Sequence, residues 1–440
     1  MKITTKQSLL IFLTMILLIS CVEGNSGDPQ GVEMKNSEFD SVFVFLDNSA
    51  SMFNYEKGND NFFRSDLNKL FDIINDVQKA EPSWYFNVVN TKIHKINIGL
   101  DHFRRGNNVY TNKLKVGNLT RTDYEKIFDL LLQNTSNSGI SIFITDLLYD
   151  TKDLVHNSPE GVAASFESMA KNKFREFSKK GKSTIIIKMT ANYKGNYYPN
   201  FSNNGKKLPA FKVDQERPYY VIILGKTENI NLLIKSKTFG QKGYLKERMQ
   251  GFDNYFSFFN PEEFKENIYY TALPYSLKPV KFSASKDDLR GNNSITNLYY
   301  RYSGIEGAFY IAADFTKVPL FNYYLNERDY YEVSPNDLVE IEEIKNVNNV
   351  SIHNLDKKRL KACNKVIEME LDKIENMQIV IKLKTVLPEW IEETDSKTDG
   401  INNHAGTSTT FAFLNFMRGL QDAYRFDSDI IKMNINIKKD

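Results

Sequence analysis

The sequence predicts an α/β protein in which a doubly wound, mainly parallel sheet over residues 39–240 precedes a β-rich, sandwich-like region over residues 241–440. Apolar runs of strand length alternate with helical patterns in the first part, as in proteins whose parallel strands are connected by helices. These runs are almost continuously apolar, which is typical of strands buried on both faces. After about residue 240, polar and apolar residues alternate, and this pattern favours antiparallel strands.

Five apolar runs are expected to form the strands of the first sheet. Each is rich in Val, Ile or Phe. The segment from Asn196 to Pro218 separates the last two runs and is rich in Pro, Asn and Gly, so we expect a long surface loop there, with a binding surface as the alternative. The expected strands are Val42–Leu46, Trp84–Val89, Ile140–Thr145, Thr184–Met189 and Tyr219–Leu224.

Three amphipathic patterns between these runs predict helices, because their apolar residues recur at helical spacing. The third helix is expected to end at Gly181, which can take the left-handed conformation of a helix cap after Lys179 and Lys180. The apolar sets are Leu67, Leu70, Phe71, Ile74 and Val77; Tyr124, Ile127, Phe128 and Leu131; and Val162, Phe166, Met169, Ala170, Phe174 and Phe177.

The second part contains strand patterns, an aromatic stretch and a late helix. Gly307–Phe315 and Met377–Val386 alternate with the period of a strand. The aromatic stretch Phe252–Phe259 is expected to pack in a core or between domains, with a sugar- or partner-contacting surface as the alternative. A helical face near the end has no packing partner that the sequence indicates; it consists of Phe413, Phe416, Met417, Leu420 and Tyr424.

The N-terminus has the pattern of a secretory signal. Lys2 and Lys6 precede an apolar run, Leu9–Ile19, that is short for a membrane span. "LLISC", Leu17–Cys21, then resembles the lipobox of bacterial lipoproteins. We therefore expect residues 1–21 to be a lipoprotein signal peptide with its lipobox, and residues 22–38 to be a flexible tether, because they are poor in large apolar residues.

The lipobox resemblance implies a location in the bacterial cell envelope. Cleavage before Cys21 would leave an acylated N-terminal cysteine, and two or three acyl chains anchor a protein stably to a membrane. Val22 follows where an Asp would favour retention at the inner membrane, so the resemblance favours the outer membrane. Cys363 is then left without an intramolecular partner and is expected to be a small buried apolar residue.

Composition and motifs narrow the classes of function. The chain has 57 basic and 55 acidic residues, a net charge of +2, so nothing in the overall charge favours a nucleic-acid partner. GxSxG, HExxH, GxxxxGK and GxGxxG patterns are absent, and the five histidines are scattered. We therefore predict that the protein is not an enzyme.

Oxygen-bearing side chains follow two of the expected strands. Asp47, Ser49 and Ser51 come directly after the first strand, and Asp146 follows Ile140–Thr145. Ligands of open α/β sheets bind beyond the carboxyl ends of the strands, so these side chains should meet at one edge. Oxygen clusters suit hard cations such as Mg2+, with Mn2+ or Ca2+ as alternatives. The competing interpretation is a set of turn and capping residues.

A threonine before the second predicted helix is expected to complete this cluster. Thr120 and Thr122 both precede that helix. Thr122 lies three residues before Glu125, as in a capping box, so Thr120 is slightly favoured as the cation ligand. Thr111 is a third, weaker candidate.

Together these residues resemble the metal-ion-dependent adhesion site of von Willebrand factor A domains. That pattern is Asp-x-Ser-x-Ser, a loop threonine and a strand-end Thr-Asp, matched here by "DNSAS", Thr120 or Thr122, and Thr145-Asp146. The resemblance implies that the serines and the threonine contact Mg2+ directly, with Asp47 and Asp146 in water-mediated or alternating contact. It also implies that an acidic residue of a protein partner can fill the remaining position.

The chain departs from the family pattern at two places. Ala50 and Leu147 stand where the family often has glycine, so the local loop conformations can differ. The leading hypothesis is a lipid-anchored envelope protein that binds a protein partner through a Mg2+-dependent site. The alternatives are an envelope hydrolase or glycan-processing factor with its site after residue 240, and a metal-free structural subunit of an envelope complex.

Overall fold

The structure is a computed structural model. Glu38–Asp440 form one compact unit. Residues 1–37, which contain the expected signal peptide, Cys21 and the tether, lie outside the described residues. The described residues are 38–57, 62–105, 115–117, 119, 122–149, 158–197, 210–264, 268–277, 282–290, 294–360, 363–397, 408–425 and 429–440.

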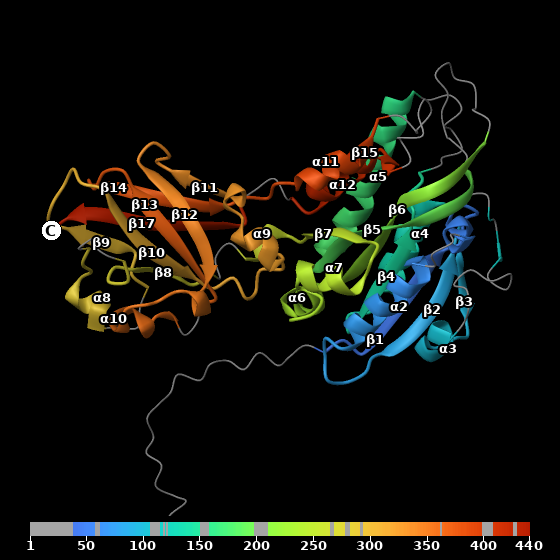
Figure 1. The fold of residues 1–440 in the computed structure, drawn as a ribbon, viewed down its shortest axis with the longest axis horizontal. Helices are drawn as coiled ribbons and strands as arrows, with labels where there is room; N and C mark the ends of the chain where they lie inside the picture. Colours follow the sequence, from blue (N-terminus) through green and yellow to red (C-terminus); the bar gives the residue numbers. More distant parts are fainter. Residues whose placement is uncertain are drawn as a thin grey trace, which may run out of the picture. The chain divides into compact units, whose positions relative to one another are not determined.

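Seven strands form the first sheet, in the order β3-β2-β1-β4-β6-β5-β7 (Figure 1). All five strands expected from apolar runs are present. β1 pairs in parallel with β2 and with β4, and these three strands have the buried Val, Ile and Phe content from which they were predicted. The strands are β1 (Ser41–Asp47), β2 (Ser83–Val89), β3 (Ile93–Ile96), β4 (Gly139–Thr145), β5 (Lys182–Tyr197), β6 (Phe211–Lys226) and β7 (Phe252–Phe258).

The prediction of a mainly parallel, doubly wound sheet is wrong for the other half of this sheet. β6 lies between β4 and β5 and runs antiparallel to both, and β7 and β3 are antiparallel edge strands. β5 and β6 pair along their whole length, from Lys182 opposite Lys226 to Tyr197 opposite Phe211. Strands that pair as a hairpin must be antiparallel, whereas a parallel pair needs a long crossover connection.

The long loop expected from Asn196 to Pro218 is therefore partly strand. Phe211–Pro218 belong to β6, and Asn196 and Tyr197 end β5. Residues 198–209 lie outside the described residues. The polar residues of "FKVDQER" misled the prediction, because they alternate with buried ones, as in a strand with one exposed face.

The three predicted helices are confirmed, with their apolar sets facing the core, except that Val77 lies two residues beyond the end of the first helix. α2 spans Phe62–Asn75, α4 Tyr124–Asn134 and α5 Pro159–Lys179. α5 ends as expected, with Lys180 as the C-cap and Gly181 at a φ of +62°. The other helical segments of this part are η1 (Met52–Lys57), α3 (Leu100–Arg105), α6 (Thr227–Lys235), α7 (Lys242–Arg248) and η4 (Pro261–Glu263).

The late helix, α12 (Phe413–Ala423), packs on α5 (Figure 1). Phe416 contacts the rings of Phe166 and Phe174. The two backbones come close at Gly419, where an added Cβ would lie 2.4 Å from the Glu167 carbonyl oxygen. The C-terminal part of the chain thus completes the helical layer of the first sheet.

Two four-stranded sheets make up most of the second part, in the orders β12-β13-β10-β8 and β11-β14-β17-β9. The strands expected in Gly307–Phe315 and Met377–Val386 are confirmed as β10 and β14. The strands are β8 (Tyr270–Leu273), β9 (Asn297–Tyr300), β10 (Gly307–Ala313), β11 (Tyr331–Ser334), β12 (Val339–Asn346), β13 (Lys365–Leu371), β14 (Met377–Leu383) and β17 (Ile431–Lys439).

Short helices and a small ladder connect these sheets. They are α8 (Lys286–Arg290), α9 (Asn322–Asn326), η5 (Arg328–Tyr330), η6 (Val347–Asn349), α10 (Asn354–Lys357), α11 (Glu389–Thr394), β15 (Asp395–Ser396) and β16 (Thr410–Phe411). Among the described residues, no helix combines the length and the apolar content needed to cross a membrane.

The aromatic stretch Phe252–Phe259 packs in the core, as predicted. Tyr255 stacks on Phe321, with ring centroids 3.6 Å apart, and its carbonyl accepts a hydrogen bond from the Tyr324 hydroxyl at 2.6 Å. The Ser257 hydroxyl donates to the carbonyl of Pro319 at 2.7 Å. β7 therefore joins the first sheet to segments that follow β10.

Candidate functional site

Two buried carboxylates lie at one edge of the first sheet. Asp47 is the last residue of β1, and Asp146 directly follows Thr145, the last residue of β4. The two strands are parallel neighbours, so their carboxyl ends meet at the same edge. Asp47 is fully buried and Asp146 is 2% exposed.

Three hydrogen bonds orient Asp47. The Thr122 hydroxyl donates to Oδ1 at 2.8 Å, and the Ser49 backbone N–H donates to the same oxygen at 2.9 Å. The Thr145 hydroxyl donates to Oδ2 at 2.7 Å. Bonds of this kind favour the ionised carboxylate and hold the Asp47 side chain in one orientation, although burial acts against ionisation.

The two loop serines lie side by side. Ser49 Oγ and Ser51 Oγ are 3.0 Å apart. Asn48 and Asn90 support the loop: Asn90 Nδ2 donates to Asn48 Oδ1 at 3.2 Å, and both amides donate to the carbonyl of Val116. Sequence reasoning missed these two asparagines, because buried amides that bond each other across loops leave no local pattern.

Asp146 has one oxygen without a partner. Its Oδ1 accepts a hydrogen bond from the Leu148 N–H at 3.3 Å, while its Oδ2 is buried and bonds no other described group. A buried carboxylate oxygen that is left unpaired costs free energy. A cation at this position would remove that cost.

The pKa values of both carboxyl groups are raised. Burial is the main cause for Asp146, and the nearby charge of Asp47 adds to it, so the pKa of Asp146 rises to about 6. Burial also raises the pKa of Asp47, against the hydrogen bonds that lower it. Two adjacent buried carboxylates repel each other, and a divalent cation between them would stabilise both ionised forms.

The capping box expected at Thr122 and Glu125 is wrong. Asp123 is the N-cap of α4, and its side chain accepts a hydrogen bond from the Lys126 N–H at 3.3 Å. This frees the Thr122 hydroxyl for its bond to Asp47. Of the two threonine candidates, the structure brings Thr122 to the cluster, while Thr120, like Thr111, lies outside the described residues.

Leu147 has the backbone conformation that the glycine of the family pattern would take easily. Its φ is +52°, in the left-handed region. This conformation turns the chain sharply after Asp146, while the Leu147 side chain is fully buried. The chain therefore makes the turn after Asp146 with leucine, and not glycine, at position 147.

The β5–β6 hairpin reaches the same edge and was not predicted to do so. The Tyr55 hydroxyl donates to the carbonyl of Pro218 at 2.6 Å, and Asn54 Nδ2 donates to the Tyr193 hydroxyl at 2.9 Å. Gly195 allows this contact, since an added Cβ would lie 2.2 Å from Asn54 Oδ1. Arg217, 2% exposed, lies on this hairpin. Sequence reasoning did not identify Arg217 as a site residue, because it lies in the segment that was expected to be a polar loop.

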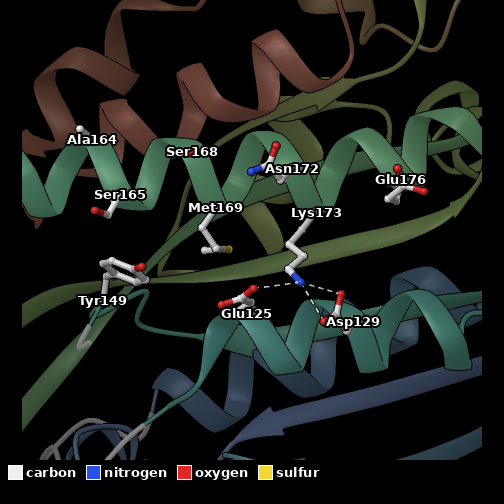
Figure 2. Close-up of a pocket in the computed structure, with 10 residues that line it drawn as sticks. All are labelled: Glu125, Asp129, Tyr149, Ala164, Ser165, Ser168, Met169, Asn172, Lys173 and Glu176. Atoms are coloured by element: carbon white, nitrogen blue, oxygen red, sulfur yellow. Dashed lines mark hydrogen bonds and ion pairs between the residues drawn. The ribbon is translucent and has the colours of Figure 1, made fainter. Parts of the chain in front are cut away.

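A separate cavity of about 620 Å³ lies between α4 and α5 (Figure 2). Lys173 occupies its middle, where its Nζ lies 2.8 Å from Asp129 Oδ2 and 3.4 Å from Glu125 Oε1. Glu176 and Tyr149 line it as well. None of the carboxylates or serines of the cluster lines this cavity, and its lysine is neutralised by its own neighbours.

A second group of acidic residues lies on the second part of the chain. The carboxylates of Glu340, Glu342 and Glu370 approach one another within 4.8 Å, and all three residues are exposed. Exposed carboxylates are fully hydrated and repel one another only weakly. Their grouping by itself assigns no site.

Comparison with protein-family models, with curated proteins and with solved structures gives no match. The cluster is therefore interpreted from its own geometry.

Proposed function

We propose that the edge formed by β1 and β4 holds a Mg2+ ion and, through it, binds an acidic residue of a protein partner. The observation that carries this proposal is the buried, unpaired Oδ2 of Asp146, beside Asp47 and the paired hydroxyls of Ser49 and Ser51. Hydroxyl and carboxylate oxygens are the ligands that Mg2+ prefers, and Mn2+ or Ca2+ could take the same ligands.

The residues of such a site would have two roles, as metal ligands and as groups that position the ligands. Ser49, Ser51 and Thr122 would offer hydroxyl oxygens, and Asp146 an unpaired carboxylate oxygen. Asp47 would act through its hydrogen bonds, because Thr122, Thr145 and the Ser49 N–H fix its orientation. When bound, the ion would supply a positive charge that attracts a partner's carboxylate. This arrangement is similar to the adhesion site of von Willebrand factor A domains.

We further propose that the protein is anchored through an acylated Cys21 in the bacterial outer membrane. The support is the "LLISC" sequence after an apolar run, with Val22 at the following position. A membrane-anchored protein that binds a partner through a cation can hold that partner at the cell envelope. Such a role needs no catalytic residues.

Thermal melting of the full chain in detergent tests the metal site. A ligand that binds only the folded state stabilises it by about 2.7 kcal/mol at 100 times its Kd. We expect Mg2+ to raise the Tm of the unaltered protein relative to chelator, and the Ser49→Ala, Ser51→Ala double variant to lose most of this rise. The matched control is Ser165→Ala, Ser168→Ala on the exposed face of α5, which should keep it.

Equal melting temperatures of the unaltered protein in Mg2+ and in chelator would contradict the proposal. That outcome would instead favour the metal-free structural subunit.

A further inference from the structure

Arg217 is a buried cation that forms no direct ion pair with a described carboxylate. The side chain is 2% exposed, and its Nε has no hydrogen-bond partner. It forms no ion pair with a carboxylate in the described part of the chain. Charged side chains are rarely buried unless they are paired, because removing a charge from water costs several kcal/mol. A buried, unpaired arginine therefore indicates a missing anion.

The strand register places Arg217 at the edge that carries Asp146. Tyr220 of β6 lies opposite Thr145, the last residue of β4. β6 is antiparallel to β4, so Arg217, three residues before Tyr220, lies roughly 10 Å beyond the end of β4. The two residues are near enough for their charges to interact.

Aromatic rings hold the guanidinium in place. Its central carbon lies 4.2 Å from the ring centroid of Tyr197 and 5.2 Å from that of Tyr193. The Tyr193 hydroxyl in turn accepts a hydrogen bond from Asn54, in the helical turn after the serine loop. Stacking on ring faces stabilises the cation without using its N–H donors, and the Nε–H, which has no hydrogen-bond partner, stays available to an anion.

An additional anion would offset the positive charge of Arg217. Asp47 and Asp146 carry two negative charges when both are ionised, and a divalent ion would offset these. A single carboxylate would then supply the negative charge that Arg217 lacks.

We propose that Arg217 and the Asp47–Ser49–Ser51–Asp146 cluster form one subsite for the carboxylate of an acidic partner residue. The metal ion binds one carboxylate oxygen, and the guanidinium donates hydrogen bonds to the other. This inference rests on the proposed function and adds to it a residue that selects an anionic partner group. Arg217 is on the hairpin of β5 and β6, so that hairpin becomes part of the binding site (Figure 1).

Isothermal titration calorimetry with Mg2+ tests the subsite, with acetate as the carboxylate probe. The full chain in detergent is titrated in chloride and in acetate at the same ionic strength. We expect acetate to lower the apparent Kd for Mg2+ about fivefold in the unaltered protein, because coupling between sites is reciprocal. In Arg217→Gln, Mg2+ should bind more tightly in chloride, since a repelling charge is gone, and the effect of acetate should be much smaller, because acetate keeps only its contact with the metal ion.

Lys194→Gln is the matched control, because it removes the same charge from an exposed position of the same hairpin. It should keep the acetate effect. An undiminished acetate effect in Arg217→Gln would overturn the inference and leave the metal site standing. Absence of Mg2+ binding in the unaltered protein under both conditions would overturn the inference and the proposed function together.

Arg217→Lys covers the case in which Arg217→Gln fails to fold. It keeps the positive charge but lacks the planar pair of donors that a carboxylate accepts. We expect a weaker acetate effect in this variant, and an undiminished effect would overturn the role of Arg217.

Discussion

At the scale of single residues, the free energy gained by burying a side chain offsets a strained backbone next to Asp146. Leu147 has a left-handed backbone conformation that costs an L-residue roughly 1–2 kcal/mol. Its fully buried side chain contributes about 2–3 kcal/mol, so burial outweighs the backbone cost. Leucine can therefore stand where the family pattern has glycine. The turn it forms aims the following N–H of Leu148 at Asp146.

Asp146 should make the metal-free protein sensitive to pH. Its pKa rises from 3.8 to about 6 in the folded state, through burial and the charge of Asp47. The folded state therefore binds this proton more tightly than the unfolded state, so the contribution of this group to stability is greatest below about pH 4 and is lost as the pH rises through about 6. By this shift, the ionised group costs about 3 kcal/mol at most.

Asp146→Asn should therefore raise the Tm in chelator near neutral pH and flatten its fall with pH. The same variant should lose the stabilisation by Mg2+, so the two effects have opposite signs. Melting curves across this pH range, with and without Mg2+, measure both. Asp76→Asn, an exposed substitution directly after α2, is the control. A lower Tm of Asp146→Asn in chelator would contradict the assignment.

At the scale of elements, long-range contacts fix the positions of the β5–β6 hairpin and of α12. The local hydrophobic pattern of the sequence does not predict these contacts. The hairpin inserts β6 between β4 and β5 and brings Arg217 to the edge of the sheet. α12 closes on α5 at Gly419, and Phe416 fills the space between neighbouring phenylalanines. Each contact joins segments that are distant in the sequence.

Gly419→Ala should destabilise the protein, although alanine is the better helix former by about 1 kcal/mol. The new Cβ would lie 2.4 Å from the Glu167 carbonyl oxygen, so α12 must move away from α5. Overpacking of this kind costs about 1–3 kcal/mol, and the net loss should appear as a lower urea midpoint.

Gly243→Ala in α7 is the matched control, because its added Cβ meets no atom within 4 Å. It should leave the midpoint unchanged or raise it. A raised midpoint in Gly419→Ala would mean that α12 does not approach α5 closely.

At the scale of the whole molecule, segments of the second part complete and brace the first sheet. Asn231 Nδ2 of α6 donates to the carbonyl of Thr316 at 3.0 Å, and Lys235 Nζ donates to that of Leu320 at the same distance. Together with the contacts of β7 and α12, these bonds join both parts of Glu38–Asp440 into one buried core. The edge that carries Asp47 and Asp146 therefore belongs to the same compact unit as the second part.

The proposed anchor predicts that Cys21 carries lipid. In bacteria fed a clickable palmitate analogue, we expect the full chain to be labelled and to sediment with membranes. Cys21→Ser should lose both properties. Cys363→Ser should keep the label, since Cys363 is half-buried and burial raises the pKa of its thiol to about 12. Labelling that survives in Cys21→Ser would contradict the anchor.

Hydrophobic periodicity is a local property, so the sequence alone predicts the apolar strands, the amphipathic helices and the positions of Asp47, Ser49, Ser51 and Asp146 at strand ends. The antiparallel direction of β6, the bond of Thr122 to Asp47 and the position of Arg217 at the same edge are apparent only in the folded chain. Those outcomes depend on which distant segments pair, and pairing is decided by burial and hydrogen bonding over the whole fold.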